Sequence, residues 1–314
     1  MTTLTLIDAL TQTDDSLLTS LPKSDLHNHG MLGYRRDVLK RHYNADIQEP
    51  PAKFHVFKEF EDYLNHTLGP YIPQAGFFET SLRNAFLQAK VDGVRVLQMS
   101  IDSRFFYYLP GSMMTDMIER THKECAPEIA FYPQLGMDRA HNFNRLMHEV
   151  ENLLDTGFFK SIDLYGDELH GSVDDFVPIY RKAQQMGLVL TAHVGEYGSA
   201  ESVRTTAETL QLNQIQHGIA AAESIEVMQW LADNKILLNV CPSSNVALCR
   251  AVSLEQHPIR TLFDHGVRVS INTDDLFVFD QSVSDEFRNL HKAGVFHAAE
   301  LEQIRQYGLQ AFET

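Results

Sequence analysis

The sequence predicts an α/β protein: a (β/α)8 TIM-type barrel with a long helical insertion after the first strand. Short apolar runs alternate with longer amphipathic stretches along the 314 residues, and polar or titratable residues follow several of the runs. This alternation is typical of parallel strands joined by helices. A doubly wound open sheet is usually shorter and carries a Gly-rich nucleotide turn, and no GxGxxG or GxxxxGK[ST] follows any run. We expect residues 1–314 to form a single barrel domain.

The apolar runs are the expected strands of the barrel. Several are rich in β-branched residues over four to seven positions, which is typical of strands buried on both faces. The expected strands are residues 24–27, 94–99, 129–135, 161–166, 188–193, 214–217, 236–241 and 267–272.

Between the expected strands, apolar residues recur at helical spacing. One such stretch ends at Gly187, a natural C-cap, and its i, i+3, i+4, i+7 residues are Phe176, Ile179, Tyr180 and Ala183. A second helix is expected over residues 221–233. The residues expected on its buried face are Ile225, Met228 and Leu231.

The gap between the first two expected strands is much the longest in the chain. It contains the segment FHVFKEFEDYLNHTL (54–68), whose aromatic residues recur every third position. This segment is either a helix that packs on the barrel or an apolar lid over its top. The second interpretation follows from the rule that a βα insertion lies at the catalytic face of a barrel.

Composition and charge exclude several classes of partner. The net charge is −16, from 42 Asp+Glu against 26 Lys+Arg, so we expect neither nucleic acid nor a membrane surface as a partner. The three cysteines are too few for a disulfide framework and suit a reducing compartment. The chain shows neither a signal peptide nor an apolar run long enough for a membrane helix, so a cytoplasmic location is expected. The 15 histidines invite a search for metal ligands.

Polar and titratable residues follow the expected strands, whereas the strand interiors are apolar. A barrel places every strand's carboxyl end on one face, so these residues converge although they are far apart in sequence. The pattern therefore indicates a catalytic site. The segments concerned are His27–Asn28–His29, Gly166–Asp167–Glu168, His193–Val194–Gly195–Glu196, His217–Gly218 and Asn272–Thr273–Asp274–Asp275.

The spacing of these residues suits a catalytic metal. His27 and His29 point to the same side of an extended segment, so both imidazoles can bind one divalent ion. A third histidine and one carboxylate, for which Asp274 is the candidate, would leave room for a water molecule. His217 either binds the metal or orients its hydroxide. Any one of these histidines alone is more typical of a structural, hydrogen-bonded residue, and it is their convergence that favours a metal site.

Glu196 and Asp275 lie beside the expected ligands without being needed as ligands. Glu196, three residues after His193, can take a proton from water and deliver it to a leaving group. Its alternative role is to cap the helix that starts near Ser199. Asp275 is left free to hydrogen-bond a substrate.

With these residues in view, the sequence resembles the adenosine deaminase family of metal-dependent (β/α)8 aminohydrolases. The resemblance covers nearly the whole chain, and its segments occur in the family's order with family-like spacings. The segments are LPKSDLHNHG (21–30), DLYGDE (163–168), TAHVGEYGSAESVR (191–204), QIQHGI (214–219), CPSSN (241–245) and INTDD (271–275).

The resemblance implies one bound Zn²⁺, with Fe²⁺ as the alternative, and a small aminopurine as substrate. The implied metal ligands are His27, His29, His193 and Asp274. The implied reaction is hydrolytic deamination of an adenosine-like nucleoside. A metal-bound hydroxide attacks the amine-bearing ring carbon, and ammonia leaves.

The resemblance also implies roles for four further residues. Glu196 is implied as the proton shuttle to the ring nitrogen beside the amine-bearing carbon, and His217 as the residue that holds the attacking hydroxide. Asp275 would hydrogen-bond the imidazole-side nitrogen of the base. The backbone of Gly166 would contact another ring nitrogen.

The chain departs from the family pattern near the substrate. In adenosine-specific members, a spacer and then an Asp-Gly follow the His-x-His, whereas here Gly30 follows His29 directly. The group beyond the base is therefore expected to differ: a free base, a modified ribose, or a phosphate bound by Arg35 or Arg36. Two further departures are Leu276, where the family usually has Pro, and Gln98–Met99–Ser100, where it has Glu-x-Arg.

Three alternatives stay open beside an adenosine-like substrate. The first is a deaminase of a free base or a modified adenine derivative. The second is a metal hydrolase of esters or amides on the same barrel, although no Lys ends the fourth strand to bridge two metals. The third is a binding or signalling module, which the presence of all four ligands and Glu196 disfavours. Deaminases of flipped bases are excluded because the chain has no Cys-x-x-Cys. The oligomeric state is left open.

Overall fold

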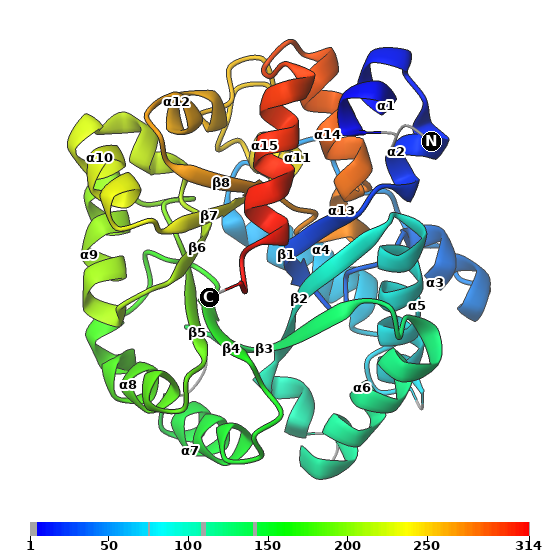
Figure 1. Cartoon of the computed structure of the whole chain (residues 1–314). Helices are drawn as coiled ribbons and strands as arrows, with labels where there is room; N and C mark the ends of the chain where they lie inside the picture. Colours follow the sequence, from blue (N-terminus) through cyan, green and yellow to red (C-terminus); the bar gives the residue numbers. More distant parts are fainter. Residues whose placement is uncertain (1–4, 75, 108–110, 141–142, 314) are drawn as a thin grey trace.

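The protein forms a closed barrel of parallel strands surrounded by helices (Figure 1). The computed structural model describes residues 5–74, 76–107, 111–140 and 143–313. The sheet has eight strands in the order β1 to β8, each parallel to the next. The strands are β1 Lys23–His29, β2 Val94–Asp102, β3 Ala130–Asp138, β4 Ser161–Tyr165, β5 Val189–Val194, β6 Gln214–His217, β7 Leu237–Val240 and β8 Arg268–Ile271. This arrangement confirms the predicted (β/α)8 fold.

The barrel closes where its first strand meets the segment after its last. Asn28 forms a parallel bridge with Asp274, and the Asp274 amide donates to the His27 carbonyl at 2.8 Å. The Asn272 side chain also accepts from the Leu26 amide at 2.7 Å. Closure therefore brings two of the motifs, at residues 27–29 and 271–275, into direct contact.

Two strands extend further toward the catalytic face than the sequence predicts. β2 continues through Ser100 to Asp102, and β3 continues through Gly136 to Asp138. These added residues are paired in register, with Ser100 beside Gln134 and Asp102 beside Gly136. Because they lie at the carboxyl ends of the strands, they add polar groups to the rim of the barrel.

Most of the outer helices bury an apolar face against the barrel. In α8, Ile179, Tyr180 and Ala183 are buried as expected, and Gly187 follows with a φ of +74°. The outer helices are α6 Gly111–Cys125, α7 Phe143–Leu154, α8 Val177–Gln185, α9 Ala200–Leu210, α10 Ile225–Asp233, α11 Pro242–Ala247, α12 Ile259–Asp264, α13 Leu276–Phe279, α14 Val283–Lys292 and α15 Ala298–Leu309. Short 3-10 turns cover Ser103–Tyr107, Val173–Phe176 and Ile219–Glu223.

The helix expected over residues 221–233 is divided in the structure. A 3-10 turn ends at Glu223, and Ser224 then caps α10 by accepting from the Val227 amide at 3.3 Å. Met228 and Leu231 are buried as expected, but Ile225 is 72% exposed, so its assignment to the buried face was wrong. Because Ser224 starts a new helix, Ile225 falls at its first turn and faces solvent.

The long insertion after β1 forms three helices, α3 Arg36–Tyr43, α4 Phe57–Leu68 and α5 Phe77–Val91. α5 packs on β2 and α6 as an ordinary barrel helix. α4 lies over the catalytic end, where Phe60 packs parallel to Phe279 at 6.1 Å and Phe57 meets the Tyr197 ring edge-on at 5.7 Å. The long helical insertion is thus confirmed.

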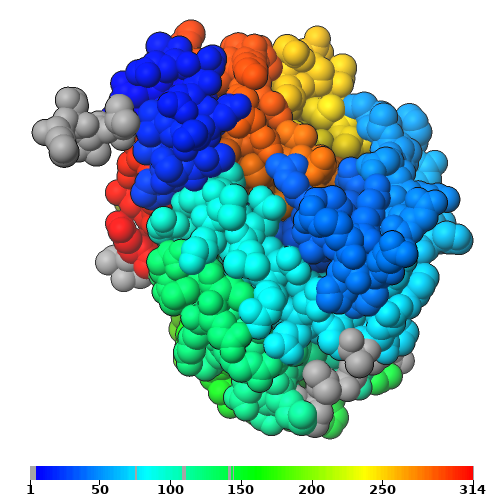
Figure 2. Space-filling model, turned by 90° about the vertical axis from the view of Figure 1, so that its right-hand side faces the viewer, coloured from blue at the N-terminus to red at the C-terminus, as the bar shows by residue number. Residues whose placement is uncertain are grey.

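The opposite end of the barrel is covered by the two ends of the described chain. α15 packs across β1 and β8, and its Gly308 allows a close approach, because a Cβ there would stand 2.0 Å from Ser24 Oγ. The Phe312 ring stacks on Tyr132 at 3.6 Å. The N-terminal helices α1 Leu6–Gln12 and α2 Asp15–Ser20 pack beside α14 and α15 (Figure 2). Within the described residues, no helix is long and apolar enough to span a membrane.

Candidate metal centre and active site

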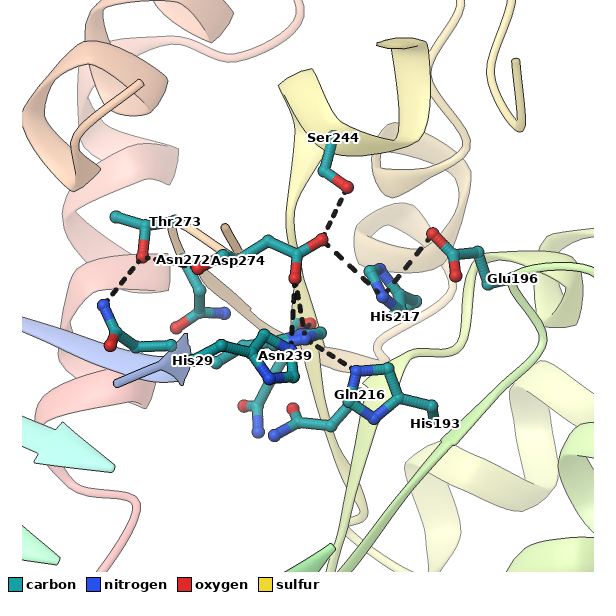
Figure 3. A network of polar contacts seen from close by, with 12 residues as sticks. His29, His193, Glu196, Gln216, His217, Asn239, Ser244, Asn272, Thr273 and Asp274 are labelled. Atoms are coloured by element: carbon teal, nitrogen blue, oxygen red, sulfur yellow. Dashed lines mark hydrogen bonds and ion pairs between the residues drawn. The ribbon is translucent and has the colours of Figure 1, made fainter. Parts of the chain in front are cut away.

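The structure brings together the histidines and carboxylates that the sequence singled out. His27 and His29 come from β1, His193 from β5, His217 from the end of β6, and Asp274 from the segment after β8. At the carboxyl end of the barrel, the side chains of His29, His193, His217 and Asp274 point toward one another (Figure 3). His27, His193, His217 and Asp274 are each less than 9% exposed, and the side chain of His29 is 19% exposed.

His27 is the residue shared by the two groups of ligand atoms that include the other expected ligands. The Nε2 atoms of His27 and His193 are 3.0 Å apart. Oδ1 of Asp274 lies 3.4 Å from Nε2 of His27 and 3.4 Å from Nε2 of His29. His27, His29 and Asp274 form one group with ligand atoms within 4.8 Å of one another, and His27, His193 and His217 form a second. Neutral imidazoles and one carboxylate are a typical donor set for Zn²⁺ or Fe²⁺.

The hydrogen bonds made by Nδ1 of His27 and of His193 leave Nε2 of each ring free to bind a metal. Nδ1 of His27 lies 3.2 Å from the Asn239 carbonyl, and Nδ1 of His193 lies 3.0 Å from Oδ2 of Asp163. A carbonyl and a carboxylate only accept, so each Nδ1 carries the proton and each Nε2 has a lone pair. Two lone pairs facing each other at 3.0 Å repel unless a cation lies between them. The site therefore fits a divalent metal.

Two of the site residues have left-handed backbone conformations. His217 has a φ of +62° and Asp274 a φ of +58°, which cost side-chain-bearing residues about 1–3 kcal/mol each. The surrounding hydrogen bonds hold them in place. The Ser244 hydroxyl donates to Oδ2 of Asp274 at 2.6 Å, and the Asn245 amide lies 3.1 Å from Nδ1 of His217. Backbone strain of this kind is concentrated at functional sites.

Glu196 is buried beside this cluster and does not cap a helix. Its Oε1 lies 3.5 Å from Nε2 of His217 and has no hydrogen-bond partner among the described residues. Burial raises the pKa of the Glu196 carboxyl well above its usual range, and the Asp274 charge adds to this effect. The cap of α9 is instead Ser199, whose hydroxyl accepts from the Ser202 amide. The alternative role of Glu196 as a helix cap is therefore wrong.

One carboxylate holds the loop that carries Glu196. Glu168 accepts hydrogen bonds from the amides of Gly195 and Gly198 at 2.7 Å each, and also from the amide of Tyr197. These amides lie on both sides of Glu196, so the loop has little freedom to move that carboxylate. The sequence analysis quoted Glu168 within a motif and assigned it no role.

Asp275 and Gly166 also face the site. Oδ1 of Asp275 is buried and has no hydrogen-bond partner among the described residues, and burial raises the pKa of Asp275 to about 7. Gly166 has a φ of +92°, and a Cβ there would stand 2.7 Å from Oδ1 of Asp138. Only glycine suits this position, because both its backbone conformation and its contact exclude a side chain.

A cavity of about 300 Å³ opens above the metal cluster. The metal cluster, Glu196, His217 and Asp275 line its inner end. Its apolar wall comes largely from the insertion and the segment after β1. These segments contribute Met31, Leu32, Phe57, Phe60, Leu64, Leu68 and Ile72, and Phe105 and Leu248 complete the wall. The polar residues of its outer end are Glu61, Ser100, Asp102, Arg104, Asp138 and Tyr165.

Arg35 and Arg36 do not contribute to this cavity. Arg35 forms ion pairs with Asp280 and with Asp285, the latter at 2.7 Å. Arg36 donates to the carbonyls of Phe277 and Val278 and pairs with a glutamate of the insertion. Both guanidinium groups therefore hold the insertion against the segment after β8. Neither arginine lines the cavity, so the structure gives no support to the expectation that one of them binds a substrate phosphate.

Four residues that act through a neighbouring side chain or loop give no signal in the sequence. Asp163 contacts His193, and Glu168 accepts from the amides of the Glu196 loop. Ser244 donates to Asp274, and Asn245 hydrogen-bonds His217. All four lie inside the quoted family-like segments. Their residue type alone carries no signal, because each meets its partner only in the folded barrel.

Comparisons with known proteins agree with this geometry. A family model described as adenosine deaminase matches residues 98–312. A Treponema pallidum protein, provisionally named adenosine/adenine deaminase, is 31% identical over 296 residues, which cover 91% of this chain and 97% of that protein. An adenine deaminase of Sinorhizobium medicae is 36% identical over 156 residues, about half the length of each chain.

Solved structures share the fold at lower identity. The crystal structure of an adenine deaminase from Arthrobacter aurescens superimposes with a TM-score of 0.83 at 21% identity, covering 94% of both chains. The N6-mAMP deaminase of Arabidopsis gives a TM-score of 0.77 at 19% identity, again covering 94% of both chains. The family match spans more than half of the chain, and the Treponema relative spans nearly all of it. The chain belongs to the adenosine deaminase family of metal-dependent aminohydrolases.

Proposed function

We propose that this protein catalyses the hydrolytic deamination of an aminopurine, with release of ammonia. One observation carries the proposal. Two buried carboxylate oxygens, Oε1 of Glu196 and Oδ1 of Asp275, line the cavity and lack hydrogen-bond partners among the described residues. Buried polar atoms are rarely left unpaired, so these two oxygens are suited to partners supplied by a substrate.

The proposed metal ligands are His27, His29, His193 and Asp274, with Zn²⁺ as the first candidate ion and Fe²⁺ as the second. Their arrangement supports this choice, because the imidazole lone pairs converge with one carboxylate oxygen. When bound, such an ion acts as a Lewis acid that lowers the pKa of water to near neutrality.

Glu196 is the proposed proton shuttle. Its raised pKa means that the carboxyl can hold a proton near neutral pH, so it can give that proton to the ring nitrogen beside the amine-bearing carbon. Protonation there turns the ring carbon into a better electrophile. Glu196 then takes one proton from the attacking water and delivers it to the departing amine, which leaves as ammonia. The second water proton returns to Glu196 as the ring carbonyl forms.

His217 and Asp275 orient the reactants in this proposal. Burial holds the pKa of His217 well below its usual range, so its ring is neutral and acts through hydrogen bonds. Asp275 lines the same cavity, and burial raises its pKa to about 7, so its carboxyl, when protonated, can donate to the imidazole-side nitrogen of a purine. The Gly166 backbone faces a second edge of the base.

The outer end of the cavity disfavours a phosphate. Among the described residues that line the cavity, Arg104 is the one lysine or arginine, and it lies at this outer end, here called the rim. Its Nε donates to Asp102 at 2.6 Å, and its NH1 lies 3.6 Å from Asp138. Glu61 adds a further acidic group, so the rim repels an anion. The named Arabidopsis neighbour acts on a nucleotide, and this rim suits a base or nucleoside better.

The unsubstituted base is the preferred substrate within this proposal. Oδ1 of Asp138 lies against Gly166, where the resemblance places a ring nitrogen of the purine. The next nitrogen along that edge carries an N–H in the free base and a sugar in the nucleoside, and a carboxylate accepts from an N–H. The segment after His29 offers Met31 and Leu32 to the cavity, where adenosine-specific relatives have an aspartate for the ribose.

The test is ammonia release by the metal-loaded protein with adenine, adenosine, AMP and N6-methylated adenines, using Glu196→Gln as the blank. We expect adenine to be turned over fastest and AMP not at all. Glu196→Gln should retain the metal and lose activity by about a hundredfold or more. Wild-type activity in Glu196→Gln would contradict the assigned shuttle. Preference for AMP would contradict the assignment of the acidic rim.

A further inference from the structure

A buried histidine outside the catalytic cavity is connected to His217 through one asparagine. His257 lies between α11 and α12 and is 2% exposed, and Asn245 lies in α11 and is fully buried. His257 does not line the catalytic cavity. The two side chains nevertheless form a continuous line of hydrogen bonds that ends at Nδ1 of His217.

The line of hydrogen bonds begins at the Ile259 backbone N–H, which can act only as a donor. It donates to Nδ1 of His257 at 3.1 Å. Burial lowers the pKa of His257 to about 3, so its ring is neutral. A neutral ring that accepts at Nδ1 carries its proton on Nε2.

The orientation of the asparagine follows from this proton. Nε2–H of His257 faces Oδ1 of Asn245 at 3.3 Å, so the amide oxygen accepts there. The amide nitrogen therefore points the other way, toward Nδ1 of His217 at 3.1 Å. Because an amide N–H donates, Nδ1 of His217 must accept, and the proton of that ring lies on Nε2.

We propose that His257 is a positioning residue that acts through Asn245 to fix the tautomer of His217, so that His217 presents an Nε2–H to the reacting oxygen. The inference rests on the proposed function. Nε2 of His217 lies 3.5 Å from Oε1 of Glu196 and 4.0 Å from Oδ2 of Asp274, so this N–H is directed into the reaction site.

This tautomer assigns His217 a role that the sequence left open. A nitrogen that carries a proton has no lone pair for a metal and cannot take a second proton. His217 is therefore a hydrogen-bond donor, although it lies within ligand distance of His27 and His193. The proton acceptor in this proposal is then Glu196, whose Oε1 lies 3.5 Å from Nε2 of His217. An amide free to turn would allow the opposite tautomer, which exposes a lone pair next to the metal ligands.

Asn245→Asp is the sharpest test because it is nearly isosteric and reverses the hydrogen bond. A carboxylate only accepts, so His217 must then carry its proton on Nδ1. We expect kcat to fall by about 10²–10³-fold, as for removal of one donor to a developing negative charge, with KM changed less than about twofold. The bound metal content should stay the same.

The tautomer itself is observable without turnover. In the ¹⁵N spectrum of the zinc-loaded, ¹⁵N-histidine-labelled protein, with His217 assigned by its loss in His217→Gln, wild type should show a protonated Nε2 and an unprotonated Nδ1. Asn245→Asp should reverse this pattern. A wild-type ring protonated on Nδ1 would overturn the proposal without any variant. The spectrum also separates this result from a failure of the proposed activity, since it needs no substrate.

Variants of His257 test the first step of the line. His257→Phe removes the donor to Asn245 and should lower kcat, whereas His257→Gln retains an amide donor and should recover part of it. The matched control is Asn234→Asp, an exposed asparagine at the end of α10, which adds the same charge and should leave kcat unchanged. Wild-type kcat in both His257→Phe and Asn245→Asp would refute the positioning role.

Discussion

At the scale of the residue, the chemistry of each active-site histidine is decided by the partner of its outer nitrogen. Asp163 accepts from Nδ1 of His193, which leaves the inner nitrogen as a lone pair for a metal. Asn245 donates to Nδ1 of His217, which leaves the inner nitrogen as a donor. We therefore infer opposite roles for these two buried imidazoles. The partner of Nδ1 is a carboxylate for His193 and an amide for His217.

Replacing the Asp163 carboxylate should weaken metal binding. Asp163→Asn keeps an oxygen near His193 and removes the charge that supports its Nδ1 proton. We expect metal affinity to fall by about 10–100-fold, as measured by competition with a chelator. Asp155→Asn, at an exposed residue that pairs with Lys182, is the control and should bind metal like wild type. Unchanged affinity in Asp163→Asn would show that Asp163 does not orient the ligand.

At the scale of the element, the loop after β5 and helix α4 define the cavity. The loop carries Glu196 and is held by Glu168, which lies in the loop after β4. Helix α4 covers the cavity with Phe57, Phe60 and Leu64. In the proposed function, strand β5 therefore supplies the metal ligand His193, the loop after it supplies the proton shuttle Glu196, and helix α4 supplies part of the apolar wall.

Removal of the Glu168 carboxylate should misplace Glu196. Glu168→Ala leaves the amides of Gly195, Tyr197 and Gly198 without their acceptor, and we expect kcat to fall by about tenfold or more while the metal is retained. Glu168→Gln keeps the oxygen that accepts from Tyr197 and Gly198, so its kcat should be intermediate. The measurement is steady-state kinetics together with metal content. Equal kcat in wild type and Glu168→Ala would remove the loop from the mechanism.

Truncation on helix α4 should affect substrate binding more than stability. Phe57 is only partly buried, lines the cavity and contacts the Tyr197 ring edge-on. Phe57→Ala should raise KM severalfold with a small change in Tm, because the side chain covers the substrate more than it fills the core. Phe143→Ala, on the outer helix α7, is the control for loss of a phenyl ring and should leave KM unchanged. An unchanged KM in Phe57→Ala would mean that α4 is not a lid.

At the scale of the whole molecule, closure of the barrel makes the two ends of the chain interdependent. β1 pairs with the segment after β8, and α15 packs on both strands. The proposed metal ligand His27 thereby meets the proposed ligand Asp274. The single-domain organisation over residues 1–314 stays a prediction, and this pairing supports it because no part of the barrel can be removed without opening the site.

The buried acid Glu286 should make the stability of the whole fold depend on pH. Burial raises the pKa of Glu286 from 4.5 to about 8. The folded state therefore binds this proton more tightly than the unfolded state, so the contribution of Glu286 to stability is largest below pH 4.5 and is lost as the pH rises toward 8. Glu286→Gln keeps the acceptor for the Ser243 amide and removes the titration.

Glu286→Gln should therefore unfold at a higher temperature than wild type above about pH 8, and the difference should shrink toward about pH 5. Thermal unfolding followed by circular dichroism at both pH values measures this. Glu119→Gln, at a surface residue paired with Lys123, is the matched control and should show no such pH-dependent difference. A wild-type-like Tm of Glu286→Gln at high pH would mean that the buried carboxyl is not protonated in the folded state.

The sequence by itself determined the fold class and the convergence of the metal-site residues. His27, His29, His193 and Asp274 lie at strand ends, and the carboxyl ends of parallel strands in a barrel must share one face. That rule needs only the order of strands and helices. It also placed the long insertion on the catalytic side.

Only the tertiary structure decided how those residues are used. Arg35 and Arg36 turn to protein carboxylates and carbonyls, away from the cavity, and Ile225 faces solvent because Ser224 starts its helix. The tautomer of His217 depends on Asn245, which is 28 residues away, and the loop of Glu196 depends on a carboxylate before β5. Hydrogen bonds between distant segments have no periodicity in sequence, since each depends on where two side chains meet after the barrel has closed.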